Sequence, residues 1–393
     1  MTTPQPLSRH SFTVHTYENG GVCIQHSAFT GTGGTAEHHL LFSVTDTSLP
    51  PGQQLNAVYE AYRNVWREQL PENGTAVFRR YFLSDAAALW SQVMEHDRDL
   101  PICAVSIVQQ PPVNGSRIAL WAYVQTGMET KVHGTGLFEA SHNGYSHLWA
   151  GGLFNQAANS EFQTRLLLND YILMLCQVGA TMGNNGIRTW FFVQNVKENY
   201  PGVVKARTEV FLTQNLTEKT HYVASTCIEG RYLHPDVLAQ LDAYAVKGLE
   251  PGQVRYLHAP THLNPTYEYG VTFERGTAVT YGDRTHLFIS GTASLDNKGK
   301  VLFPDDVLKQ TDRILENISA LLREGGASLT DVVQMVVYLR HASDGKKVSR
   351  HIQTACPEMP FLIVEAPGYR PAWLIEIECV AIQASNHPDF RAL

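Results

Sequence analysis

The sequence predicts a mixed α+β fold built from three similar units that follow one another along the chain. The chain has 393 residues, which is long enough for two or three ordinary domains. An order of strand, long helix, strand, short helix and strand recurs along it. The helices are amphipathic and alternate with strands of mixed polarity, so we expect them to cover one face of each sheet. The uncovered faces are then expected to pack against one another.

The C-terminal third shows this order most clearly. Its expected elements are a strand over His286–Gly291, a helix over Val307–Arg323, and strands over Val332–Arg340 and Trp373–Ile382. Apolar residues recur in the helix at a spacing near 3.6, and Gly325-Gly326 is a typical stop signal. The strand at Val332 is rich in β-branched and aromatic residues, which favour sheets.

The other two thirds repeat the order, and the first is the most divergent. In the middle third we expect strands at His147–Gly152, Arg188–Gln194, His221–Thr226 and Asp242–Lys247, with helices at Glu161–Gly179 and Val203–Thr213. In the first third we expect strands at His39–Val44, Ala76–Phe82 and Ala119–Val124, with helices at Leu55–Gln69 and Ala86–His96. The predicted units span residues 10–128, 129–255 and 256–393.

Composition and charge exclude several classes of function. Lysine plus arginine total 30 against 37 acidic residues, giving a net charge of −7, and there is no basic run to bind nucleic acid or an anionic membrane. No segment is apolar enough for a signal peptide or a membrane span. The six cysteines lack CxxC spacing, which favours reduced thiols in a cytoplasmic protein over disulfides or zinc.

The sequence shows no motif for a metal or an organic cofactor, and we expect none. His258 and His262 have a spacing of four, but Pro260 breaks the helix that would align them. Cys227 has no obvious base beside it, so a buried, inert thiol is expected. The remaining candidates for chemistry are glutamates, arginines and tyrosines near the C-terminal strands.

The last expected strand carries two glutamates on one face. A period of two places Glu376 and Glu378 together, about 7 Å apart, and Ile375 and Ile377 on the opposite face. Neighbouring carboxylates and burial both raise a pKa, so a glutamate that is protonated near pH 7 is one interpretation. A carboxylate paired structurally with an arginine is the other, and the residues alone leave both open.

The third unit resembles the reactive intermediate deaminase (Rid) superfamily over about residues 268–385. The motifs that carry the resemblance are Ile289–Ser294, Gln310 with Glu316-Asn317, Gly326–Ser328 before Asp331, Val337–Arg340 and Ile375–Glu378. The resemblance implies chorismate-mutase-like units of α+β class. Family members are usually homotrimers with ligand pockets between subunits, so three units in one chain imply a self-contained pseudo-trimer, with a monomer as the simplest state.

A narrower resemblance, over about residues 130–385, is to the chorismatases. Its motifs are Asn199-Tyr200 with Lys205–Arg207, His221–Thr226 with Glu229–Arg231, Tyr269–Gly276, and Arg370–Glu376. Chorismatases hydrolyse the enolpyruvyl ether of chorismate and release pyruvate. The resemblance implies that Glu376 is the catalytic acid and that a small carboxylic acid is the substrate.

Chorismate is a dicarboxylate, and arginine holds a carboxylate with two parallel hydrogen bonds. The candidate substrate-binding residues are Arg207, Arg231, Arg275, Arg284, Arg370 and Tyr200. Each arginine alone is more often a surface or ion-pair residue. The motifs that contain them favour binding.

Two positions depart from the family patterns. Rid deaminases bind the substrate carboxylate through an arginine about 15 residues before the strand glutamate, where this chain has Phe361, which argues against imine deamination in the third unit. The second departure is at Tyr369, where the resemblance to chorismatases implies a cysteine or a small residue. We include Tyr369 among the catalytic candidates. Its ring is expected either to narrow the pocket or to turn outward and pack at the domain surface.

Three functions remain open from the sequence. The leading hypothesis is a chorismatase-like hydrolase. The second is a Rid-type enamine or imine hydrolase that uses another unit's pocket. The third is a catalytically silent protein that binds a small metabolite, because a fold alone does not determine function.

Overall fold

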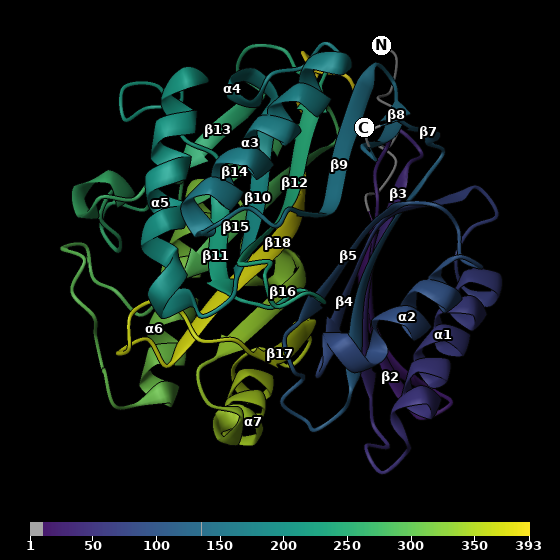
Figure 1. Ribbon diagram of the computed structural model, residues 1–393. Helices are drawn as coiled ribbons and strands as arrows, with labels where there is room; N and C mark the ends of the chain where they lie inside the picture. The colour runs from purple at the N-terminus through teal and green to yellow at the C-terminus, as the bar shows by residue number, and fades with distance from the viewer. Residues whose placement is uncertain (1–10, 135) are drawn as a thin grey trace, which may run out of the picture.

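The chain folds into three six-stranded sheets, each with helices on its outer face (Figure 1). The computed structural model describes residues 11–134 and 136–393. Residue 10, where the first predicted unit begins, lies outside the described residues. The prediction of three α+β units in one chain is confirmed.

The first sheet has the strand order β1-β2-β3-β6-β4-β5. Its elements are β1 (Ser11–Asn19), β2 (Val22–Thr30), β3 (Ala36–Val44), α1 (Pro51–Glu68), β4 (Gly74–Leu83), α2 (Ala86–Asp97), β5 (Ala104–Gln109) and β6 (Ile118–Thr126). Strand β5 is parallel to β4, and the other pairings are antiparallel.

The second sheet has the order β11-β10-β12-β9-β8-β7. Its elements are β7 (Glu129–Val132), β8 (Phe138–His142), β9 (Tyr145–Phe154), α3 (Ser160–Gln177), α4 (Met182–Asn185), β10 (Gly186–Val193), α5 (Val196–Thr213), β11 (Ala224–Glu229) and β12 (Ala239–Lys247).

The third sheet has the order β13-β14-β15-β18-β16-β17. Its elements are β13 (Val254–Leu257), β14 (Gly276–Thr280), β15 (Arg284–Thr292), α6 (Val307–Glu324), β16 (Val332–Leu339), α7 (Gly345–Ala355), β17 (Phe361–Glu365) and β18 (Ile375–Ala384), with short 3₁₀ turns at Thr266–Tyr269, Leu329–Asp331 and Ala342–Asp344.

Each sheet has strands that the sequence reasoning did not include. The first two strands of each unit along the chain were missed: β1 and β2, β7 and β8, and β13 and β14 form antiparallel pairs. In two of the units a short edge strand after the second helix, β5 or β17, was also missed. The glycine pair Gly20-Gly21 was a signal in the sequence for the first hairpin. Both residues have positive φ, which a tight turn between strands requires.

Helix α5 begins seven residues before the predicted start at Val203. Two backbone N–H groups at its beginning, those of Asn195 and Val196, donate to the carboxylate of Glu229 over 3.0 and 2.7 Å. This carboxylate comes from the end of β11 and satisfies orphan donors at the helix terminus. Local sequence could not show this cap, because Glu229 lies 33 residues further along the chain.

The inner faces of the three sheets share one core. Aromatic side chains from all three units meet there, among them Phe78, Trp121, Trp149, Trp190 and Tyr338. Each sheet also packs against its own helices, and this forms three further cores, one in each unit. The expectation that the uncovered sheet faces pack against one another is therefore confirmed. No helix within the described residues has the length and apolar character to cross a membrane.

The units meet in a cyclic pattern around a pseudo-threefold axis. Strand β5 lies beside β9, β11 beside β15, and β17 beside β3. Register pairs identify corresponding positions: Ala119 pairs with Phe82, Gln240 with Phe192, and Glu376 with Tyr338, each one residue before the end of the partner strand. Two residues further along, the corresponding positions are Trp121, Asp242 and Glu378.

Buried charges connect the three units near this axis. Arg80 of the first unit donates from Nε and Nη2 to Asp242 of the second over 3.0 and 2.8 Å, and its Nη1 lies 3.8 Å from Glu378 of the third. Arg188 of the second unit donates to Glu378 over 2.7 Å. All four side chains are at most 3% exposed, so each depends on its partners for compensation of its charge.

Replacing Arg80 with methionine will destabilise the fold by about 3–5 kcal/mol, because it leaves a buried carboxylate uncompensated. Urea unfolding of Arg80→Met against wild type measures the loss. Arg63→Met, on the exposed face of α1 beside Glu60, is the matched control and should change stability by less than about 1 kcal/mol. Equal stability of Arg80→Met and wild type would show that the axis does not depend on this charge.

Candidate active site

A cavity in two parts lies where β11 of the second unit meets β15 of the third. The inner part, of about 30 Å³, is lined by residues that include Ser225, Gly291 and Glu376. The outer part, of about 560 Å³, opens along α5. Four aromatic side chains line both parts and form the boundary between them: Tyr200, Tyr269, Tyr369 and Trp373. The inner part has the volume of one water molecule and is too small for a six-membered ring while these rings stay in place.

Glu376 projects from β18 into the inner cavity. The residue is 6% exposed, and its buried Oε2 atom has no hydrogen-bond partner within the part of the chain that the structure describes. Burial, with the neighbouring Glu378 as the second cause, raises the pKa of Glu376 to about 8, against the opposing effect of Arg275 and two other arginines. This carboxyl group is therefore protonated near pH 7.

Two glycines leave space for the Glu376 carboxyl group. A Cβ atom at Gly291 would collide with Oε1, and one at Gly368 would lie 2.9 Å from Oε2. Gly291 lies in the irregular part of β15, between Ile289 and Thr292, where the register with β18 shifts. Backbone from two segments therefore approaches both carboxyl oxygens closely, and any larger residue would push the acid out of its position.

Glu378 lies on the same face of β18 but has a full set of partners. It accepts hydrogen bonds from Arg188 over 2.7 Å, from Trp190 Nε1 over 2.9 Å and from the Thr226 hydroxyl. Both interpretations of the sequence thus hold, one for each glutamate. Glu378 is the structurally paired carboxylate, and Glu376 is the acid with the raised pKa.

Two arginines line the inner cavity. Arg207, on α5, donates from Nε to Thr272 over 3.2 Å, and its buried Nη2 has no partner among the described residues. Arg275 donates to the carbonyl oxygen of Asn264 from Nε and Nη2, over 3.2 and 2.9 Å. Both guanidinium groups are fixed by these bonds and by contacts with Phe273. An unpaired buried guanidinium nitrogen favours an anionic ligand.

The aromatic boundary contains two of the predicted site residues. The rings of Tyr200 and Tyr369 stack with centroids 4.5 Å apart and an interplanar angle of 19°. Arg370 lines the outer cavity, with its guanidinium carbon 5.5 Å from the ring centroid of Tyr269 and 5.4 Å from that of Trp373. Tyr369 lines both parts of the cavity, at the boundary between them.

Arg340 is a site residue that the sequence reasoning did not select. It donates to the carbonyl oxygens of Gly368, Arg370 and Trp373 over 2.7, 2.7 and 2.8 Å. These bonds hold the loop that carries Tyr369 over the cavity. Burial lowers the pKa of Arg340, while the charge of Glu376 opposes this shift. The motif that ends in Arg340 was visible in the sequence, but its bonds to a loop some 30 residues away were not.

The cysteine that lines this cavity, Cys227, is expected to be an unreactive thiol. Cys227 lies on β11 and lines the inner part. Burial raises its pKa to about 12, with Arg207 opposing the shift. A thiol with this pKa is a poor nucleophile near neutral pH.

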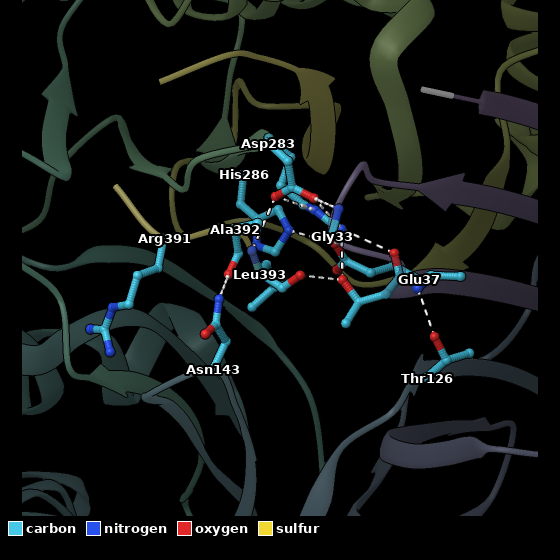
Figure 2. A network of polar contacts seen from close by, with 12 residues as sticks. Gly33, Glu37, Thr126, Asn143, Asp283, His286, Arg391, Ala392 and Leu393 are labelled. Atoms are coloured by element: carbon cyan, nitrogen blue, oxygen red, sulfur yellow. Dashed lines mark hydrogen bonds and ion pairs between the residues drawn. The ribbon is translucent and has the colours of Figure 1, made fainter. Parts of the chain in front are cut away.

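Arg284 does not lie at this site. It bonds Glu37, Asp283 and Thr35 in a buried network close to the C-terminal residues, where Figure 2 shows Glu37, Asp283 and His286 gathered beside Leu393. The prediction that Arg284 binds the same substrate is corrected, because Arg284 is the first residue of β15 and the cavity lies at the other end of this strand, near Gly291.

Arg231 and Phe361 also lie away from the lining of this cavity. The Arg231 side chain is 51% exposed, and its Nε lies 3.7 Å from Glu229, the residue that caps α5. Its motif belongs to a loop that bridges to Gln109 of the first unit, so its assignment to the Glu376 site is corrected as well. Phe361 begins β17 and lines a different cavity.

His258 and His262 lie beside different acidic side chains. His258 lies 3.5 Å from Glu274, and His262 lies 3.5 Å from Glu316. Across residues 11–134 and 136–393, no three histidine, cysteine or acidic side chains form a cluster suited to a metal ion.

Comparison with known proteins assigns the chain to a family. A family model described as endoribonuclease L-PSP matches residues 277–383. A RutC family protein of Pyrococcus abyssi is 40% identical over 99 residues, covering 24% of this chain and 76% of the relative. A RutC family protein of Pyrococcus horikoshii is 35% identical over 97 residues, covering 24% of this chain and 77% of the relative. The chain belongs to the RutC family.

A larger part of this RutC family member is similar in fold to a chorismatase. A chorismatase crystal structure superposes with a TM-score of 0.61 and covers 80% of this chain and 96% of the chorismatase chain, at 17% identity. At this identity the similarity establishes the fold. The fold of three Rid-like units in one chain is therefore shared with a chorismatase, and the chemistry must be argued from the residues of the site.

The raised pKa of Glu376 makes stability depend on pH in a defined direction. Between the ordinary pKa of 4.5 and about 8, the folded chain holds a proton that the unfolded chain has lost. The contribution of this group is fully present below pH 4.5 and is lost as the pH rises through 8, with a slope that approaches about 1.4 kcal/mol per pH unit. Urea unfolding from pH 5 to 9 should show Glu376→Gln gaining stability relative to wild type up to about pH 8.

The control for this series is Glu358→Gln, which removes an exposed glutamate of the same unit. Its stability should follow that of wild type at every pH. If the Glu376→Gln and wild-type curves are also parallel, the Glu376 carboxyl group titrates at its ordinary pKa and the buried, protonated acid is refuted.

Proposed function

We propose that this protein is a hydrolase of chorismatase type, which cleaves the enolpyruvyl ether of chorismate or of a related small cyclic carboxylic acid and releases pyruvate. The observation that carries the proposal is the Glu376 carboxyl group. It is buried and unpaired, its pKa is raised to about 8, and it faces a cavity with two fixed arginines. A protonated acid beside cations suits the transfer of a proton to an anionic substrate.

The cations are arranged in two groups that suit a dicarboxylate. Arg207 and Arg275 line the inner cavity beside Glu376, and Arg370 with Lys205 line the outer one. In the proposed complex, the unpaired Nη2 of Arg207 binds the enolpyruvyl carboxylate, and Arg370 binds the ring carboxylate from the rim. Arg340 acts through the loop that it holds, as a positioning residue.

The proposed reaction uses only groups of the chain and water. Glu376 gives its proton to the methylene carbon of the enolpyruvyl group, and the electron pair of the double bond forms the new C–H bond. Water adds to the oxocarbenium carbon and returns a proton to the Glu376 carboxylate. The hemiketal then collapses: its hydroxyl group becomes the ketone of pyruvate, the ether C–O bond breaks, and the hydroxyl proton passes to the departing ether oxygen, which leaves as a hydroxyl group of the dihydroxycyclohexadiene acid. One water molecule is consumed and no oxidant is needed.

The size of the inner cavity places a condition on this reaction. At about 30 Å³ it cannot admit the substrate unless the stacked rings of Tyr200 and Tyr369 separate. Both rings border the outer cavity of about 560 Å³, which is large enough for a six-membered ring. We propose that substrate enters from the outer cavity and displaces the Tyr369 ring.

Replacing Glu376 with glutamine will lower kcat on chorismate by a factor on the order of 10² to 10⁴, the usual contribution of a general acid. For wild type, kcat/KM should fall as the pH rises past about 8, because the acid loses its proton. Coupled detection of pyruvate measures both effects, and Glu358→Gln should keep wild-type rates. Full activity of Glu376→Gln would remove this residue from the mechanism.

The pyruvate assay, together with ammonia detection and thermal melting, separates the alternative functions. Ammonia release from imino acids without pyruvate release from chorismate would identify the Rid-type enamine or imine hydrolase. A ligand-induced rise in melting temperature without turnover of either substrate would identify a silent binding protein. Either result overturns the proposed hydrolysis of chorismate.

Replacing Tyr369 with alanine will raise kcat/KM on chorismate, because it removes the ring that closes the inner cavity. Wild type should form no 3-hydroxybenzoate, because the oxygen of a tyrosine side chain is a poorer nucleophile than the sulfur of a thiolate. Chromatography of the products tests both statements, with Tyr369→Phe as the control that keeps the ring. Production of 3-hydroxybenzoate by wild type would contradict the second statement, and an unchanged rate for Tyr369→Ala the first.

A further inference from the structure

The pseudo-threefold arrangement creates three clefts of the same construction. In each one, an edge strand of one unit lies beside a long strand of the next: β11 beside β15, β5 beside β9, and β17 beside β3. The loop that follows β17 crosses to the first cleft, where the carbonyl of Pro367 accepts from the N–H of Glu229. The loop that follows β5 crosses to the third in the same way, where the carbonyl of Pro111 accepts from the N–H of Glu365. We call these the acid cleft, the closed cleft and the third cleft.

The closed cleft, between β5 and β9, has no room for a ligand at the position of the acid. Gln240 corresponds to Glu376, and its Nε2 donates to the carbonyl oxygen of Ile107 over 3.1 Å. The backbone oxygen of Val105 lies 2.6 Å from the place where a Cβ of Gly151 would be. Strands β5 and β9 are thus in direct contact where the acid cleft has its inner cavity.

The third cleft, between β17 and β3, is open. Its cavity of about 650 Å³ is larger than the outer cavity of the acid cleft. Ala119, which corresponds to Glu376, lines it, so the space is not filled by the residue at that position. The cavity is also closed on one side by Pro112, Val113 and Asn114, from the loop that corresponds to the loop of Tyr369.

The walls of the third cleft are fixed by hydrogen bonds between the first and third units and within the first unit. Gln25 of the first unit donates to the carbonyl of Phe361 over 3.1 Å and accepts from its N–H over 2.8 Å, which ties β2 to β17. Asn114 donates to the carbonyl of Val44 over 2.9 Å. A cavity with walls held in this way is formed before a ligand arrives.

The charge of this cavity favours an anion. Lys346 and Arg350 of α7 line it, and neither cation has an ion-pair or hydrogen-bond partner for its side chain among the described residues. The lining residues include no aspartate or glutamate, although the chain carries a net charge of −7. Apolar atoms of Ala119, Phe361 and Leu362 cover the interior.

We propose that the third cleft is a binding site for a small carboxylic acid with a flat apolar body, held without reaction. The apolar body lies against Ala119 and Phe361, and the carboxylate lies between Lys346 and Arg350. The lining has no acidic, histidine, cysteine or tyrosine side chain that could transfer a proton. The chain therefore has one cleft with an acid and one that binds without an acid, and this proposal does not depend on the reaction at Glu376.

The probe for this site is 4-fluorobenzoate, with binding followed by ¹⁹F NMR titration of the full chain at millimolar concentration. Lys346→Gln combined with Arg350→Gln should weaken one binding event at least about tenfold, because both charged partners of the carboxylate are lost. Lys219→Gln combined with Arg323→Gln removes two exposed charges elsewhere and should leave binding unchanged. Ala119→Leu, which fills the cavity, should weaken the same event.

Arg207→Gln distinguishes the third cleft from the acid cleft. Binding at the third cleft should persist in Arg207→Gln and be lost in the Lys346/Arg350 double variant. Binding that is lost in Arg207→Gln and persists in the double variant would place the probe in the acid cleft and overturn the proposal. The absence of any binding to wild type would overturn it as well.

Discussion

The buried ion pairs near the pseudo-threefold axis are the constraint on which the rest of the structure depends. Arg80 reaches from the first unit to Asp242 of the second, and Arg188 reaches from the second to Glu378 of the third. Charges that are withdrawn from water are stable only when each finds its partner. The pairs therefore require all three units to be present and in register. They also hold Glu378 next to the unpaired Glu376 on the same strand, where Glu378 helps to raise the pKa of Glu376.

The three clefts show how repeated units came to differ. The corresponding positions hold Glu376 in the acid cleft, Gln240 in the closed cleft and Ala119 in the third cleft. An acid beside two fixed arginines suits proton transfer, an amide that bonds a neighbouring strand closes the space, and a methyl group leaves the space open. In a symmetric trimer one sequence would have to serve all three clefts. A single chain with three units has no such restriction.

The acid cleft combines rigid and movable parts. The carboxyl group of Glu376 lies between Gly291 and Gly368, and Arg275 is fixed to the backbone of Asn264. The boundary toward the outer cavity consists instead of the stacked rings of Tyr200 and Tyr369, which make contact through their faces. Aromatic stacking contributes only about 1 kcal/mol, so separating the two rings costs little free energy.

The sequence by itself determined the repeated order of helices and strands, the α+β class and the pairing of Glu376 with Glu378 on one face of the last strand. These features follow from periodicity, which is a local property of the chain. Only the tertiary structure decided which glutamate is paired and which is not, because Arg188 and Trp190 come from another unit. It also separated Arg207, Arg275 and Arg370, which reach the cavity, from Arg231 and Arg284, which do not. Burial and charge pairing depend on side chains that are distant in sequence, and no local pattern contains that information.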